Sequence, residues 1–242
     1  MWNRLLASPW VFVYITVGVL IAVLLGLLMP GKIALPVLQV AAAYPVMYSL
    51  LAGGRRARAV CCMLWWALLL GVVMVTTVVR TPDASAHAIL HGPEYAVEMF
   101  HWIRTGDGAE GTPSRFIPQH LLHLGIFAVL SLATGSLLSL LMGAMLMNYM
   151  SFYVGSLILA SKNFGMAVLM GWHPWSILRV AAFVVLGVVL AEPLISQLLQ
   201  RPYRFADAKP YIWAAVAGLI GDIIMKAALA PWWGLTLRNL IS

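Results

Sequence analysis

The sequence predicts an all-α, polytopic helical membrane bundle with about seven transmembrane helices and a short interfacial helix. Of its 242 residues, 62% are hydrophobic and only 10% are charged, a composition that a soluble domain could not bury. The apolar residues also gather in runs close to the roughly 20 residues that a helix needs to cross a bilayer, whereas membrane strands would alternate over about ten residues. We therefore expect residues 1–242 to form one integral membrane domain surrounded by lipid.

The limits of the helices follow from the proline, glycine and basic residues that interrupt the apolar runs. Pro30-Gly31 ends the first run, because proline lacks an amide hydrogen and glycine accommodates the turn. Residues 119–161 carry no charge and are too long for one crossing, so we divide them into two helices. We predict transmembrane helices at residues 9–29, 33–51, 59–79, 119–141, 143–160, 175–198 and 211–230.

Two segments outside these helices are predicted to lie near the membrane surface. Residues 80–118 form a long polar connection, and within it Gly92 and Pro93 favour the start of an interfacial helix over 93–104, since proline is tolerated at the first helical position. The tail 231–242 is short and amphipathic, and we expect it to lie in the headgroup plane.

Basic residues predict the orientation of the chain. The net charge is +7, but these residues occupy short turns, so the sequence indicates no nucleic-acid partner. The turns at 53–58 and 201–209 are densely basic, which is typical of cytoplasmic loops. We therefore predict a multi-pass protein of a bacterial inner membrane, with the N-terminus cytoplasmic, and the C-terminus and the 80–118 connection outside.

Histidine and glutamate gather in and beside the same connection. Neighbours spaced by three or four residues share one face of a helix, and imidazole and carboxylate groups there are ligands for zinc, iron or copper. The candidate metal ligands are His87, His91, Glu94, Glu98, His101, His120 and His123. The alternative is that the polar face of an interfacial helix simply meets water.

Charged residues also occur inside the predicted bundle. Asp222 and Lys226 are one helical turn apart with the acid first, so we expect them to neutralise each other. Other polar residues lie at helical spacings that would suit either helix packing or a polar pathway through the membrane. The candidate pathway consists of Asp222, Lys226, Ser131, Thr134, Asn148, Glu192 and Arg179, of which the last two are expected near the membrane surface.

No familiar catalytic motif accompanies these residues. The sequence has no His-Glu-x-x-His, no Cys-x-x-Cys and no Gly-x-Ser-Gly pattern. The leading hypothesis is a non-catalytic membrane protein, either a small permease-like transporter or a membrane subunit of a larger complex, with a membrane-protein partner or a second copy of the chain. The alternative is a metal-dependent intramembrane enzyme, a hydrolase or oxidoreductase in which Glu94 or Glu98 is the base.

Overall fold

A computed structural model describes residues 2–241, and within that range it contains eleven helices and no strand. Seven of the described helices are long and apolar enough to cross a membrane, which confirms the predicted helical membrane bundle. They are α2 (Trp10–Leu28), α3 (Ala34–Ala52), α4 (Arg56–Arg80), α7 (Pro113–Thr134), α8 (Leu137–Ala160), α10 (Pro174–Leu198) and α11 (Phe205–Ile241). The four shorter helices are α1 (Trp2–Ala7), α5 (Pro82–Ala88), α6 (Gly92–Thr105) and α9 (Phe164–Gly171).

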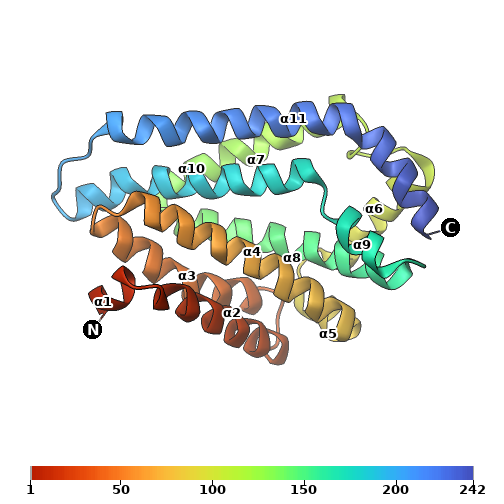
Figure 1. Cartoon of the computed structure of the whole chain (residues 1–242), viewed down its shortest axis with the longest axis horizontal. Coiled ribbons are helices and arrows are strands. Elements are labelled where there is room, and N and C mark those ends of the chain that lie inside the picture. Colours follow the sequence, from red (N-terminus) through yellow and green to blue (C-terminus); the bar gives the residue numbers. More distant parts are fainter. Residues whose placement is uncertain (1, 242) are drawn as a thin grey trace.

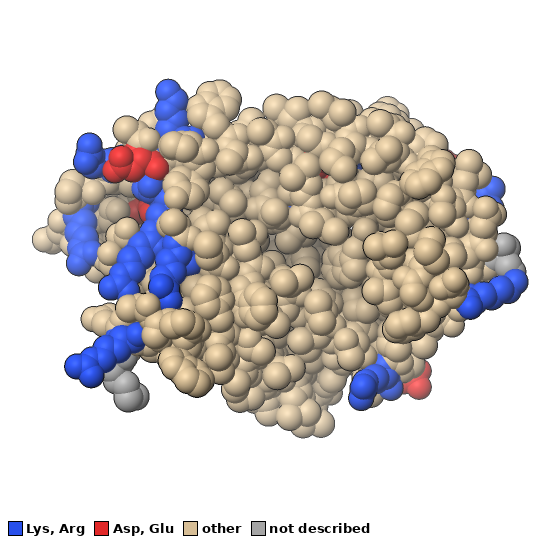
Figure 2. Space-filling view, in the orientation of Figure 1, with Lys and Arg blue, Asp and Glu red and all other residues tan. Residues whose placement is uncertain are grey.

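The long helices run along the long axis of the molecule, so their connections gather at two ends (Figure 1). We call the end with α1 and the turns after α3 and α10 the N-terminal end, and the end with α5, α6 and α9 the C-terminal end. Figure 2 shows Lys and Arg gathered mainly at the N-terminal end, with an uncharged band across the middle of this face. This distribution is the one expected of a multi-pass membrane protein.

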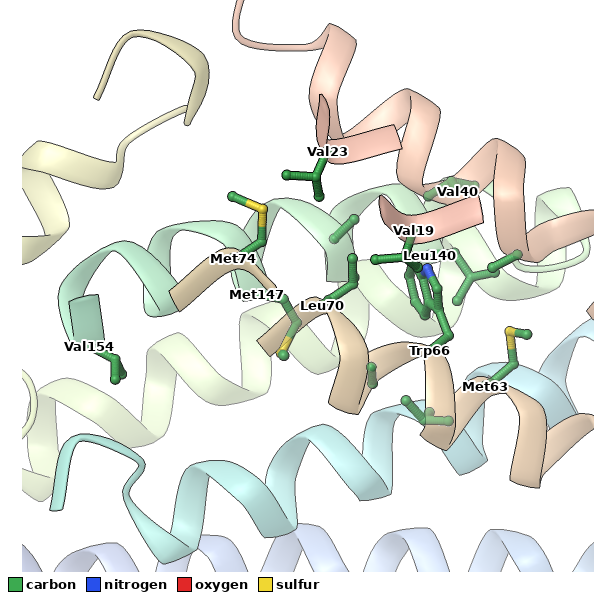
Figure 3. Close-up of a cluster of buried hydrophobic side chains, with 14 of the residues drawn as sticks. Val19, Val23, Val40, Met63, Trp66, Leu70, Met74, Leu140, Met147 and Val154 are labelled. Atoms are coloured by element: carbon green, nitrogen blue, oxygen red, sulfur yellow. The ribbon is translucent and has the colours of Figure 1, made fainter. Parts of the chain in front are cut away.

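The core is centred on the contact between α4 and α8. Trp66, Leu70 and Met74 of α4 lie among apolar side chains of α2, α3 and α8 (Figure 3). The two helices approach closely at Gly155, where a Cβ atom would lie only 2.6 Å from Cγ1 of Val78. A small residue is therefore needed at this contact, as is common where membrane helices pack.

Asn148, one of the predicted pathway residues, takes part in this packing. Its amide exchanges two hydrogen bonds with the amide of Gln39 on α3, at 3.0 and 2.8 Å. Both side chains are buried, and an unpaired amide at membrane depth would be costly. The pair therefore joins α3 to α8.

The boundary between α7 and α8 differs from the predicted one. The turn lies at Gly135 and Ser136, whose φ angles of 56° and 67° are left-handed, and not near residue 142. The Ser136 hydroxyl donates a hydrogen bond to the Gly187 carbonyl of α10 at 2.6 Å. The prediction was wrong because hydropathy does not fall at this turn, and it also missed the start of α7 at Pro113, where proline occupies the first turn.

Helix α11 extends beyond both predicted limits. It contains Pro210 and Pro231 within one helix and bends near its C-terminal end (Figure 1). The final turns are held by the Trp233 indole, which donates to the Met170 carbonyl, and by Arg238, which donates to the Ile103 carbonyl, each at 2.8 Å. The predicted boundary at residue 230 is therefore wrong, because these contacts outweigh the hydrogen bond lost at proline.

The connection 80–118 contains α5 and α6, and α6 matches the helix predicted over 93–104. Ala96, Met99 and Trp102 are buried, and α6 contacts α8 and α11. Its apolar face therefore packs against the bundle, which places the residues that follow α6 beside a cavity among the transmembrane helices.

Candidate binding cavity

A cavity of about 140 Å³ lies among the transmembrane helices near the C-terminal end of the bundle. Its walls come mainly from α7, α8, α10 and α11, with Trp66 of α4 at its inner side. Apolar residues such as Phe127 and Phe183 form much of the lining. The ionisable residues among its lining include Glu110, His120, His123, Arg179, Asp222 and Lys226.

Glu110 reaches the cavity because the loop after α6 folds back onto the bundle. Gly106 ends α6 with a φ of 80°, which is left-handed and suits glycine. At Gly111 a Cβ atom would lie 2.8 Å from the indole nitrogen of Trp102, so a side chain there would displace the loop. In this position Glu110 Oε1 lies 3.0 Å from Lys226 Nζ.

Arg179 and Asp222 form a second ion pair, which joins α10 to α11. The guanidinium donates two hydrogen bonds to the carboxylate, both 2.9 Å long. The helices are close here: a Cβ atom at Gly218 would lie 3.0 Å from that of Ala182. Asp222 is only 2% exposed, and Nδ1 of His120 lies 3.6 Å from its Oδ2.

The prediction that Asp222 and Lys226 neutralise each other is therefore wrong, because each of them has a different partner. Each residue pairs outside its own helix, Asp222 with Arg179 and Lys226 with Glu110. The Asp222 carboxylate accepts two hydrogen bonds from the Arg179 guanidinium, while the longer lysine side chain reaches the loop. Asp222 and Lys226 still share one helical face, so both ion pairs line the same cavity.

Aromatic rings connect the two pairs. Lys226 Nζ lies 4.5 Å from the ring centroid of Phe116, and this ring is 5.4 Å from that of His120. A cation over an aromatic face is further stabilised when it is desolvated, and Lys226 is only 1% exposed. The two cations and two anions balance, so the two ion pairs together carry no net charge.

Two polar atoms of this cluster have no hydrogen-bond partner. Among the described residues, Oε2 of Glu110 and Nδ1 of His120 are buried and accept or donate no hydrogen bond. Burial raises the pKa of the Glu110 carboxyl, but Lys226, His173 and Arg179 more than offset this and hold the pKa below its ordinary value. Glu110 is therefore ionised at neutral pH, and its free oxygen can only accept a hydrogen bond.

His173 lies behind the cluster inside a cage of aromatic rings. Its ring centroid is 4.7 Å from that of Trp175, 5.9 Å from Trp102 and 6.2 Å from Trp233, and its Nε2 lies 3.4 Å from the Tyr153 hydroxyl. Burial lowers the pKa of His173 to about 4. The imidazole is therefore neutral at pH 7.

Sequence reasoning missed both Glu110 and His173 as members of this region. Glu110 stands in a glycine-rich loop, and a carboxylate so placed can fold back onto a bundle. His173 is the one histidine outside the 80–118 connection and its neighbouring helix, and it directly precedes Pro174 at the start of a transmembrane helix. Neither signal indicates which neighbour the side chain meets.

The candidate metal ligands divide into two groups. His87, His91, Glu94, Glu98 and His101 are exposed on or beside α5 and α6, whereas His120 and His123 line the cavity. Within residues 2–241, the structure brings together no group of three or more His, Cys, Asp or Glu side chains that could hold a metal ion. A bound zinc, iron or copper ion thus stays a prediction of the sequence.

The remaining pathway residues lie away from the cavity. Glu192 forms an ion pair with Arg56 at the N-terminal end, with a shortest contact of 2.6 Å. Ser131 is buried, and the Thr134 hydroxyl donates to the carbonyl of Leu130 within α7 at 2.7 Å. Of the predicted pathway, the structure gathers Arg179, Asp222 and Lys226 at the cavity.

We compared the chain with protein-family models, with curated proteins and with solved structures, and none of the three comparisons found a match. The function is therefore inferred from the cavity and its charges.

Proposed function

We propose that the protein is a permease-like membrane transporter and that the cavity is its substrate site. The observation that carries this proposal is that two buried atoms, Glu110 Oε2 and His120 Nδ1, make no hydrogen bond beside two ion pairs within the described part of the bundle. A charged side chain at membrane depth costs on the order of 3 kcal/mol. A purely structural network would satisfy its polar atoms, whereas free polar atoms at a cavity wall favour a ligand.

A transporter must also close the side opposite its substrate site. Helix α10 carries Arg179 near one end and Glu192 near the other, about 20 Å apart at the rise of an α-helix. Arg56 pairs with Glu192 and also donates to the Asp207 carbonyl, so it ties α4, α10 and α11 together at the N-terminal end. In our proposal this contact closes the bundle there, and the cavity opens towards the C-terminal end.

The orientation within the membrane is part of the same proposal. Seven Lys and Arg residues lie in the segments of the N-terminal end and six in those of the C-terminal end, but six of the seven are concentrated in the two turns 53–58 and 201–209. By the positive-inside rule this end is cytoplasmic, with the C-terminus outside. Labelling of single cysteines introduced at Arg204 and at His101 from opposite sides of inner-membrane vesicles tests this orientation.

The transport proposal can be tested without knowing the substrate. Cells producing the protein, the Asp222→Asn variant or the Asp107→Asn variant are compared by mass spectrometry of metabolites inside and outside the cells. Asp107 pairs with Arg115 on the exposed surface, so its variant is the control. We expect at least one compound to redistribute with the unmodified protein and the control, and not with Asp222→Asn when the membranes contain equal amounts of folded protein. The proposal would be refuted if the Asp222→Asn variant redistributes the same compounds as the unmodified protein, or if no compound is redistributed at all.

The same preparations separate the other hypotheses. A polypeptide that co-purifies in stoichiometric amount would favour a membrane subunit of a larger complex. One metal ion per chain, lost when His87, His91 and His101 are replaced, would favour the metal-dependent enzyme.

A further inference from the structure

Three of the helices that line the cavity, α7, α10 and α11, change from polar to apolar along their length. From the C-terminal end inwards, the lining changes from His120 to Phe127 on α7, from Arg179 to Phe183 on α10 and from Asp222 to Leu219 on α11. Three helices from separate parts of the sequence therefore share the same change from a polar to an apolar lining. The cavity has one charged end and one apolar end, which is the shape of a site for an amphipathic molecule.

The cavity also reaches the lipid-facing surface of the bundle. Leu121 of α7 contributes to its lining while 57% of the residue is exposed. Gly143 of α8 lines it too, and a Cβ atom there would meet no described atom within 4 Å beyond its own helix backbone. The seam between α7 and α8 is thus a lateral opening at membrane depth.

The volume limits how much of a molecule can enter. The cavity of about 140 Å³ is smaller than the roughly 300–1,000 Å³ of pockets that enclose a whole drug-sized ligand. A polar head and the first few methylenes of a chain fit this space. The rest of a longer chain must leave through the α7–α8 seam and lie in the bilayer.

The charged end of the cavity determines which polar head group a ligand can have. Because the two ion pairs cancel, a ligand with a net charge would bring an uncompensated charge into a region of low dielectric. The free Glu110 oxygen requires a hydrogen-bond donor, while Nδ1 of His120 can donate or accept, depending on its tautomer. An uncharged hydroxyl group can donate its one hydrogen to Glu110 and accept a hydrogen bond from His120 in the tautomer that carries the proton on Nδ1.

We propose that the substrate is a lipid alcohol, an apolar chain ending in an uncharged hydroxyl head, which enters from the bilayer between α7 and α8. This inference rests on the proposed function, because it names the class of molecule that the transporter handles. The hydroxyl binds Glu110 and His120, and the chain lies along the apolar ends of α7, α10 and α11.

Photo-crosslinking tests this inference on the full chain in lipid vesicles. Three probes share a twelve-carbon chain with a diazirine and differ in the head: dodecanol, dodecanoate and dodecylamine. We expect dodecanol to label peptides of α7 and α8 at least tenfold more than the two charged probes. Glu110→Gln should reduce this labelling, and so should Leu121→Trp, which fills the seam from an exposed position and keeps the ion pairs. The matched control is Leu122→Trp, since Leu122 is 61% exposed and belongs to the outer surface of α7.

The outcomes separate the inference from the proposed function. Equal labelling by all three probes, or labelling that Leu121→Trp leaves unchanged, would overturn the lipid-alcohol site. If a water-soluble compound then still redistributes in an Asp222-dependent manner, the transporter stands without this substrate class. Selective dodecanol labelling that Leu121→Trp blocks would support the site, even if the cell assay refuted transport.

Discussion

Removal of the Asp222 charge should destabilise the protein far more than removal of an equivalent surface charge. Asp222→Asn keeps the shape of the side chain and leaves the Arg179 guanidinium without its carboxylate, to which it now makes two contacts of 2.9 Å. Breaking a buried ion pair costs about 3–5 kcal/mol. Because the Arg179 side chain is 20% exposed, we expect the lower end, about 3 kcal/mol.

Asp107→Asn provides the matched comparison. Asp107 and Arg115 lie at a similar distance of 3.0 Å, but their side chains are 64% and 57% exposed. Exposed ion pairs contribute about 0–1 kcal/mol. Asp107→Asn should therefore lower the unfolding free energy by at most a third of the loss in Asp222→Asn. The difference between the two losses is the contribution of burial.

The assay is reversible unfolding in mixed micelles of increasing denaturing-detergent fraction, followed by tryptophan fluorescence. The double variant Arg179→Met with Asp222→Asn should recover at least half of the loss, because no charge is then left uncompensated. If Asp222→Asn costs no more than Asp107→Asn, or if the double variant shows the sum of the two single losses, the ion pair is not the cause.

Three further predictions concern other buried contacts. Because the folded His173 has a pKa of about 4 instead of 6.5, only the unfolded chain binds its proton between these values, so His173 should lower the stability by about 2 kcal/mol from pH 7.5 to pH 5; His173→Phe should reduce the acid-dependent loss by this amount. Gln39→Leu should cost about 1 kcal/mol in unfolding free energy, because Asn148 loses both of its hydrogen bonds. Gly111→Ala should lower the unfolding free energy by about 1–3 kcal/mol, since its Cβ would meet Trp102 at 2.8 Å.

Each of these predictions has a control that the structure supplies. His101→Phe, at an exposed position, should leave the acid-dependent loss in place, and an undiminished loss in the His173 variant would contradict the explanation. Replacing both Gln39 and Asn148 by Leu should recover part of the single loss. Gly125→Ala has free space around its Cβ within the described residues and should not destabilise; an equal loss at both glycines would refute the steric argument.

The predicted helical membrane class needed no tertiary information, because length and hydropathy are local properties of the chain. The α2, α3 and α10 helices start and end within a residue of the predictions, since proline, glycine or basic residues interrupt the apolar runs there. The boundary at Gly135 and Ser136 was missed because the surrounding sequence is apolar on both sides of the turn. That turn is stabilised by a hydrogen bond from Ser136 to Gly187 of another helix, which periodicity cannot indicate.

Some of the charged residues of the cavity could be predicted from the sequence, but their ion-pair partners could not. The sequence by itself determined that Arg179, Asp222 and Lys226 lie on transmembrane helices and must be compensated, because an isolated charge is costly in a bilayer. Only the tertiary structure decided the partners, because Glu110 comes from a loop that folds back over Trp102, and Arg179 faces Asp222 where α10 and α11 come close. Spacing along one helix defines a shared face, but which side chain meets that face depends on how distant segments pack.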